Sequence, residues 1–397
     1  MRILYHSVSP LTLSGYGRCT AELVYRLLKW FDVDIAAYYG VQQTEITVTL
    51  EGKEGPREVR IIGGDGTVWH PLLHRIAEEY DLVLDHHDLW FCRDQVKQLE
   101  TPLVWWAIID HIPLPQPVRE VMYAPCMYST VPMTEWARRV VEDTNDPILC
   151  SVVSEPIPHG VDLDFWRNVS HEEDPLPFQE YEYHVVSVVA NHGPRENIPT
   201  MIEGFAQFLK EYGVDASLYI HADPVTPTGY NLPAIVKMCE ELYDVKLSDR
   251  IYFKELPKRY TDEFLRRIYS HADVLLMPVM GGSFEIPILE AAACGIPTIT
   301  TAFSGPGEVV GWGERGIALV PVSWMWMQLS SAKQAIVQPE QVKEALAAYW
   351  ESPCMRRDHV RKMREWIKEN ATWDIVAKKW KKELERVETV IERTMSW

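Results

Sequence analysis

The chain has 397 residues, of which 47% are hydrophobic and 24% charged, and its formal net charge is −18. This length and composition predict two globular domains, each large enough to bury a core. The acidic charge argues against nucleic acid as a partner, because binding its phosphates requires a concentrated basic surface.

The sequence also gives no sign of a membrane span or of export. No apolar run approaches the roughly 20 residues that cross a bilayer. The first predicted strand begins at Arg2, which leaves no room for a signal peptide. The seven cysteines form no Cys-x-x-Cys pair, so neither a disulfide framework nor a structural zinc site is expected. We therefore expect a cytoplasmic protein without a transmembrane segment, and a peripheral membrane contact stays open.

The N-terminal quarter alternates strand and helix patterns. A strand at residues 2–6 precedes a Gly/Ser/Pro loop, an amphipathic helix at 18–30 and a second strand at 33–39. This order predicts a Rossmann-like half. Within the loop, the glycines Gly15 and Gly17 favour a segment that faces a phosphate over a plain turn.

Two further strands, at residues 82–85 and 103–109, are each followed by polar residues. His86 to Asp88 follow the first strand, and Asp110 and His111 follow the second. The carboxyl ends of parallel strands are where clefts form, and a carboxylate and an imidazole there can exchange protons with a hydroxyl group. Polar strand ends held by backbone contacts are the alternative. A metal at the His-His-Asp cluster is not expected, because no partner cluster stands at ligand spacing.

The second half begins after an acidic, Pro-containing stretch at residues 167–182, which is the predicted linker. A strand at 183–190 leads into a loop that holds Asn191 and Arg195. Arg195 is the cation of this loop that can meet a phosphate, and an ion pair with its neighbour Glu196 is the alternative.

The segment from Gly281 to Glu308 contains the strongest chemical signal. A Gly-Gly-Ser-Phe turn leads into an apolar helical run at 286–294, followed by a strand at 298–301 and a second glycine turn at 304–307. A glycine turn at a helix start presents free N–H groups and the positive end of the helix dipole, which favours a phosphate or diphosphate. Glu290 lies about one turn inside this helix, where its carboxylate can accept hydrogen bonds from two sugar hydroxyls.

Two stretches of the chain resemble the retaining GT-B glycosyltransferases of family 4, the glycosyl transferases group 1. The first is the Ile-Pro-His-Gly-Val-Asp signature within residues 156–165, with His159 at the family's asparagine position. The second is residues 283–297, where the matching positions are Phe284, Pro287, Leu289, Glu290, Ala291, Ala293, Cys294, Gly295 and Pro297.

The resemblance implies an α/β protein with the GT-B fold. Two Rossmann-like domains would face a cleft, and the C-terminal helix would cross back to the N-terminal domain. The implied acceptor domain is 1–166 and the donor domain is 183–374, with the linker 167–182 between them. Residues 375–397 are the returning helix.

The family's activity is the transfer of a sugar from a nucleotide-diphosphate sugar to an acceptor hydroxyl with retention of anomeric configuration. It implies no cofactor, no metal and no protein nucleophile, because the donor's β-phosphate removes the acceptor proton. The acceptor is open: a glycan, a lipid-linked molecule or a small molecule.

The resemblance also implies roles for individual residues. Glu290 would hold the nucleotide ribose, Lys254 would lie beside the base, and the glycine loop with Gly15 and Gly17 would approach the donor phosphate. Asp110 and His111 would serve the acceptor side, with His86 to Asp88 competing for that role. The remaining donor-site positions are Gly282, Ser283, Phe284 and Glu285.

Several positions depart from the family pattern. The family's first glutamate falls on Gly282, and Glu285 stands where the family has a glycine. The two cations that normally neutralise the diphosphate fall on Asn191 and Glu196, which leaves Arg195 as their substitute. These departures keep two alternatives open: a degenerate member that binds a nucleotide or glycan without turnover, and an enzyme similar to nucleotide-sugar 2-epimerases.

Overall fold

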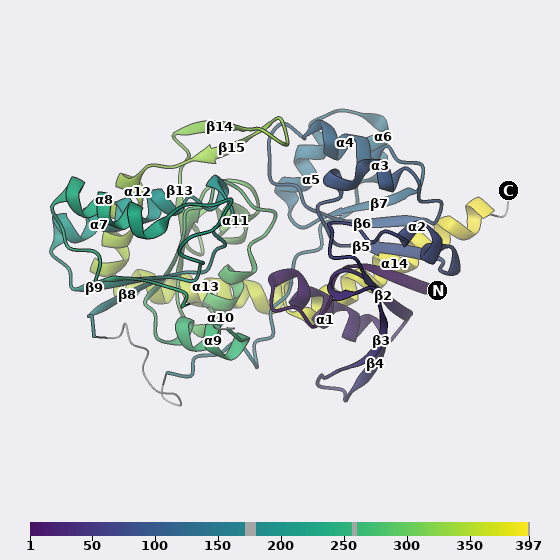
Figure 1. Cartoon of the computed structure of the whole chain (residues 1–397), viewed down its shortest axis with the longest axis horizontal. Coiled ribbons are helices and arrows are strands. Elements are labelled where there is room, and N and C mark those ends of the chain that lie inside the picture. Colours follow the sequence, from purple (N-terminus) through teal and green to yellow (C-terminus); the bar gives the residue numbers. More distant parts are fainter. Residues whose placement is uncertain (171–179, 256–259, 396–397) are drawn as a thin grey trace. The chain divides into compact units, whose positions relative to one another are not determined.

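The structure is a computed structural model that describes residues 1–170, 180–255 and 260–395. It divides into two compact units (Figure 1). The first unit contains Met1–Gly160, Gln328–Ala332 and Asn370–Trp397, and the second contains Val161–Met327 and Lys333–Glu369. Most of the predicted linker, residues 171–179, lies outside the described residues.

The first unit is built on a seven-stranded sheet in the order β3-β4-β2-β1-β5-β6-β7. β3 pairs antiparallel with β4, and the other strand pairs are parallel. The order in which successive strands are added to the sheet changes sides between β1 and β5, and α/β proteins bind ligands at such a switch point. The strands are β1 (Arg2–Val8), β2 (Asp32–Gln42), β3 (Glu45–Leu50), β4 (Arg57–Gly64), β5 (Leu82–Asp85), β6 (Leu103–Ala107) and β7 (Met127–Pro132).

Helices from both ends of the chain cover this sheet. The last helix, α14, runs beside α1 (Figure 1), where Arg26 pairs with Asp374 at 2.7 Å and the rings of Trp106 and Trp380 lie 5.3 Å apart. The helices are α1 (Gly15–Leu27), α2 (Leu73–Ile76), η1 (Ala77–Glu79), η2 (Leu89–Cys92), α3 (Arg93–Val96), α4 (Gln116–Met122), α5 (Glu135–Glu142), α6 (Pro147–Val152) and α14 (Trp373–Met395).

The second unit is built on a six-stranded sheet in the order β10-β9-β8-β11-β12-β13. Its strand pairs are parallel, and this order is that of a Rossmann fold with its switch point between β8 and β11. The strands are β8 (Tyr183–Ser187), β9 (Ala216–Ile220), β10 (Ile251–Phe253), β11 (Val274–Met277), β12 (Thr298–Thr301) and β13 (Ile317–Leu319).

The helices of this unit pack on the sheet through a continuous apolar core. A separate two-stranded ribbon consists of β14 (Ser323–Met327) and β15 (Ala332–Ile336) (Figure 1). The helices are η3 (Pro194–Glu196), α7 (Ile198–Tyr212), α8 (Leu232–Tyr243), α9 (Asp262–Ser270), α10 (Ile286–Cys294), α11 (Ser304–Val309), η4 (Gly311–Gly313), α12 (Pro339–Glu351) and α13 (Pro353–Asn370).

The prediction of two Rossmann-like α/β sheets with a returning C-terminal helix is confirmed. The predicted turn at residues 304–307 is wrong, because Ser304–Val309 forms the short helix α11. The ribbon of β14 and β15 was not predicted. Among the helices that the structure describes, none is long and apolar enough to cross a membrane.

Candidate functional site

The loop between β11 and α10 is tied to the start of α11. The N–H of Gly282 donates to the Ser304 hydroxyl at 3.1 Å, and its carbonyl accepts from the N–H of Gly305 at 2.9 Å. A Cβ added at Gly282 would stand 2.2 Å from Glu285 Oε1. Position 282 therefore has no room for a glutamate unless Glu285 moves.

Glu285 adopts a backbone conformation that suits glycine. It precedes α10 with φ 70° and ψ 82°, in the left-handed region that costs an L-residue roughly 1–2 kcal/mol. This is the position where the resemblance places a glycine. The Glu285 carboxylate forms an ion pair with Arg195 at 3.0 Å, which offsets the backbone cost.

Arg195 joins the loop after β8 to the loop after β11. Its guanidinium donates to Glu196 at 2.6 Å, to Glu285 at 3.0 Å and to the Gly281 carbonyl at 2.9 Å. The side chain of Glu196 is only 7% exposed, whereas that of Arg195 is 38% exposed. Arg195 thus pairs with its neighbour, as the alternative interpretation holds, and two carboxylates share its charge.

Glu290 lies inside α10 and is 1% exposed. The hydroxyl of Tyr269 donates to its Oε2 at 3.2 Å. This contact fixes one carboxylate oxygen in a buried position at the carboxyl edge of the sheet, because α10 begins directly after the β11 loop. The ribose role of Glu290 stays a prediction.

Asn191 and Lys254 both contact Asp223. The Asn191 amide donates to the carbonyls of Asp223 and Tyr230 at 3.0 and 2.8 Å, and its oxygen accepts from the Tyr230 N–H at 2.8 Å. Lys254 Nζ lies 2.8 Å from Asp223 Oδ1. Asn191 thus orders the loop after β9, and Lys254 lies beside that loop.

The other donor-loop positions differ in burial. Phe284 is 1% exposed, whereas Ser283 is half-buried. In the first unit, Gly17 is buried, and a Cβ there would stand 2.2 Å from the Thr12 carbonyl oxygen. Gly15 is exposed at the first position of α1. The backbone of the glycine loop is therefore closely packed at Gly17, whereas Gly15 is accessible to solvent.

The two acceptor-side candidates form a pair after β6. His111 Nδ1 lies 2.5 Å from Asp110 Oδ1, and their side chains are 13% and 12% exposed. In contrast, His86 and His87 are 0% and 5% exposed. Asp110 and His111 are thus more accessible to a substrate than the competing histidines, and Asp110 is placed to orient the imidazole.

Several histidines are buried near the switch point between β1 and β5. His6 Nδ1 lies 2.5 Å from Asp85 Oδ2, and His159 Nε2 lies 3.2 Å from His86 Nε2. Burial lowers the pKa of His6 and of His159 to about 3, and raises that of Asp85 to about 7. Burial, with His159 and His87 nearby, holds the pKa of His86 well below 6.5.

Cys19 lies close to the same histidine pair. Its sulfur and one nitrogen each of His86 and His159 all lie within 4.8 Å of one another. Cys, His and His are ligand types that zinc accepts, but a hydrogen bond between the two imidazoles accounts for their close approach. The prediction that transfer needs no metal stays a prediction.

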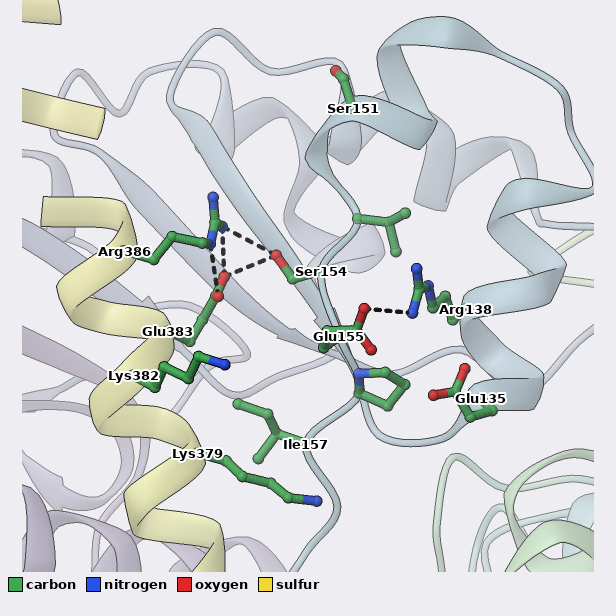
Figure 2. A pocket seen from close by; sticks show the side chains of 12 residues that line it. Glu135, Arg138, Ser151, Ser154, Glu155, Ile157, Lys379, Lys382, Glu383 and Arg386 are labelled. Atoms are coloured by element: carbon green, nitrogen blue, oxygen red, sulfur yellow. Dashed lines mark hydrogen bonds and ion pairs between the residues drawn. The ribbon is translucent and has the colours of Figure 1, made fainter. Parts of the chain in front are cut away.

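A cavity of about 640 Å³ lies elsewhere in the first unit, between α14 and the loop after α6 (Figure 2). Lys379 and Lys382 of α14 extend toward this loop, and Glu383 is hydrogen-bonded to Ser154 and Arg386 (Figure 2). None of the predicted site residues is among those that line it. Its lining holds both basic and acidic side chains, and two ion pairs, Arg138–Glu155 and Arg386–Glu383, are among them.

Several contacts of the candidate site join residues that are far apart in the sequence, and these contacts were not predicted. Glu285 pairs with Arg195, Ser304 holds the glycine turn, and Tyr269 holds Glu290. Only the position of Glu285 carried a signal, since a glutamate at the place of a family glycine indicates an unusual backbone. The other contacts join segments that are separate in the sequence.

Comparison with solved structures defines the class of protein. Sucrose-phosphate synthase from Thermosynechococcus elongatus superposes with a TM-score of 0.72 at 16% identity, covering 98% of this chain and 100% of that one. Anabaena Alr3699/HepE in complex with UDP and glucose gives a TM-score of 0.69 at 13% identity, with 97% and 99% covered. The protein has the GT-B glycosyltransferase fold.

Sequence comparison adds a match in the second half of the chain. Residues 183–332 match the family model Glycosyl transferases group 1. A probable sucrose-phosphate synthase of Thermosipho melanesiensis is 27% identical over 164 residues, covering 40% of this chain and 35% of that protein. A sucrose synthase of Denitrovibrio acetiphilus is 35% identical over 66 residues, covering 17% and 8%. Residues 183–332 are thus similar to the glycosyl transferases group 1, and the chain matches only a minor part of the length of these curated relatives.

Proposed function

We propose that the protein transfers a sugar from a UDP-sugar, with UDP-glucose as the first donor to test, to an acceptor hydroxyl. The observation that carries this proposal is the segment from Gly281 to Glu290, a glycine turn that opens α10 and is tied to Ser304. UDP and glucose occur together in the structure of Alr3699/HepE, which supports the choice of donor.

The proposed reaction breaks the bond between the sugar's anomeric carbon and the β-phosphate oxygen. A bond to the acceptor oxygen forms on the same face, so configuration is retained. The acceptor proton passes to a β-phosphate oxygen, and UDP leaves. The negative charge that grows on the diphosphate needs stabilisation in the transition state, and the positive end of the α10 dipole can supply part of it.

The chain's own side chains have distinct tasks in this proposal. Glu290 accepts hydrogen bonds from the ribose hydroxyls, and Arg195 exchanges its carboxylate partners for the diphosphate. Lys254 lies beside the base. On the acceptor side, Asp110 orients His111, whose imidazole hydrogen-bonds a sugar hydroxyl.

Nucleotide binding is the first test of the proposal. Calorimetry and thermal unfolding would compare UDP, GDP, ADP and dTDP with wild-type protein, with Glu290→Gln, and with Glu344→Gln as the matched control on the exposed side of α12. A ligand at about 100 times its Kd adds about 2.7 kcal/mol to the unfolding free energy. We expect UDP binding that Glu290→Gln weakens and Glu344→Gln leaves intact. Equal loss in both variants would refute the ribose role.

A second candidate function is nucleotide binding without turnover. The arrangement that favours it is Arg195 held between Glu196 and Glu285, because a neutralised guanidinium stabilises a diphosphate poorly. UDP release from UDP-glucose, with or without an acceptor, would exclude this alternative. Conversion of the UDP-sugar to an epimer without an acceptor would instead favour the epimerase-like alternative.

A further inference from the structure

The ribbon of β14 and β15 differs in composition from the rest of the chain. The chain holds 57 aspartates and glutamates, yet none falls between Gly316 and Pro339, where Lys333 is the one charged residue. This stretch therefore avoids the charge that dominates the rest of the surface. The lack of acidic residues indicates that this surface has a role other than keeping the protein soluble.

The ribbon, its turn and the residues directly before β14 also expose large apolar side chains to water. Val320 is 67% exposed, Val322 54%, Trp324 43%, Trp326 63% and Leu329 71%. Single exposed apolar residues need no explanation, but a contiguous group of them marks an interaction surface.

The geometry of β14 directs its two tryptophans to one face. Side chains two residues apart on a strand share a face, so Val322, Trp324 and Trp326 form a row. Lys333 Nζ lies 4.9 Å from the centre of the Trp326 ring, and Trp324 meets Phe303 edge to face at 5.1 Å. These contacts hold both rings at the surface.

This combination matches the boundary of a lipid bilayer better than a sugar or a nucleic acid. Tryptophan prefers the membrane interface, where its ring is apolar and its N–H meets water, and a lysine beside it can reach the lipid phosphates. A glycan would need hydrogen-bonding side chains around the rings. On β14 the neighbours of the two tryptophans are methionine and Ser323, and on β15 the polar residues are Lys333, over the Trp326 ring, and the buried Gln334.

We propose that the β14–β15 ribbon is a membrane-docking hairpin that inserts Trp324, Trp326 and Leu329 into the interfacial region of a lipid bilayer. The ribbon is joined to the candidate donor site, because the Ala335 N–H donates to the Met280 carbonyl at 2.8 Å, directly before Gly281. Docking would bring the donor segment to the lipid surface. The proposal does not depend on the proposed transferase activity.

Vesicle flotation tests the proposal with the full chain. Phosphatidylcholine vesicles, with and without phosphatidylglycerol, are the probe, at low and at high salt. We expect wild-type protein to float with both kinds of vesicle at both salt levels, because insertion is apolar. The double variant Trp324→Ser/Trp326→Ser should bind vesicles at least roughly tenfold more weakly than wild type, because it no longer transfers two large apolar side chains from water into the bilayer.

Two further variants keep the result interpretable. Trp312→Ser removes another exposed tryptophan, 45% exposed and outside the ribbon, and should bind as wild type does. Leu329→Glu places a carboxylate on the acid-free face and should weaken binding without touching either tryptophan. Circular dichroism and UDP binding would check that each variant is folded.

The proposal is overturned by any of three results. Wild-type protein could fail to float, the ribbon variants could float as well as wild type, or Trp312→Ser could lose as much binding as they do. Protection of the ribbon amides from hydrogen exchange by maltotetraose, with none by vesicles, would assign this face to a glycan instead.

Discussion

Acidification should destabilise the first unit through its buried histidines. His159 and His86 lie 3.2 Å apart with both rings buried. In the unfolded chain each imidazole takes up a proton near its usual pKa of 6.5, whereas burial lowers the pKa of His159 in the folded chain to about 3. The folded state therefore binds fewer protons in mildly acidic solution. The stability that neutral His159 contributes is fully present above pH 6.5 and is lost as the pH falls from 6.5 toward the folded pKa of about 3.

The magnitude follows from the difference between the two pKa values. At about pH 5.5 the unfolded state gains about 1.4 kcal/mol from protonating His159 alone, and each further pH unit adds a similar amount until the folded pKa is reached. His86 adds a loss of the same sign, because its pKa is also lowered. His6 and Asp85 oppose each other, since burial lowers the pKa of one and raises that of the other to about 7.

Hydrogen exchange of the β1 and β5 amides measures the opening free energy of this unit. We expect it to fall by at least the His159 contribution between about pH 7.5 and about pH 5.5. The variant His159→Asn removes this contribution, so its opening free energy should fall by about 1.4 kcal/mol less over the same interval. Equal pH dependence in wild type and His159→Asn would refute the argument that His159 is buried in its neutral form.

Three other changes test single contacts. Glu285→Gly should alter the unfolding free energy by less than about 1 kcal/mol, because relief of the left-handed backbone offsets the lost Arg195 pair. A large loss of stability would contradict this offset. The rate of UDP-glucose hydrolysis should rise in the same variant. Although burial raises the pKa of Glu383, hydrogen bonds from Arg386, Ser129 and Ser154 lower it overall. Glu383→Gln should therefore lower the thermal midpoint at neutral pH, and the difference should vanish as the pH falls through the depressed pKa of Glu383. Gly17→Ala should lower the thermal midpoint and disturb the loop before α1, because its Cβ would stand 2.2 Å from the Thr12 carbonyl oxygen; an unchanged midpoint would show that the loop adapts.

The order of strands and helices could be predicted because each left a local pattern. Alternating apolar runs and glycine turns located the β11–α10 segment, whereas the left-handed backbone of Glu285, at the place of a family glycine, was not predicted. The β14–β15 ribbon escaped prediction because its turn lacks the usual Asn-Gly or Asp-Gly signal. Instead Ser331 takes the left-handed conformation with φ 51°.

Contacts between distant segments could not be predicted from one sequence. His86 and His159 are separated by 73 positions, and no local pattern relates them. The pairing of Arg195 with Glu285 posed the same difficulty, because Glu285 lies on another loop. The pairing depends on how the β8 and β11 loops meet, which only the sheet order determines.

The first unit is discontinuous in the chain, and this affects how the protein can be synthesised. Its last helix, α14, is translated after the second unit, and Trp380 completes the packing on Trp106. Most of the first unit is therefore translated before the second unit but lacks α14 until the second unit has been made, so the second unit can fold before the first is completed. A ribosome that stops before Trp373 releases an N-terminal unit with an uncovered apolar surface, which quality-control proteases would recognise.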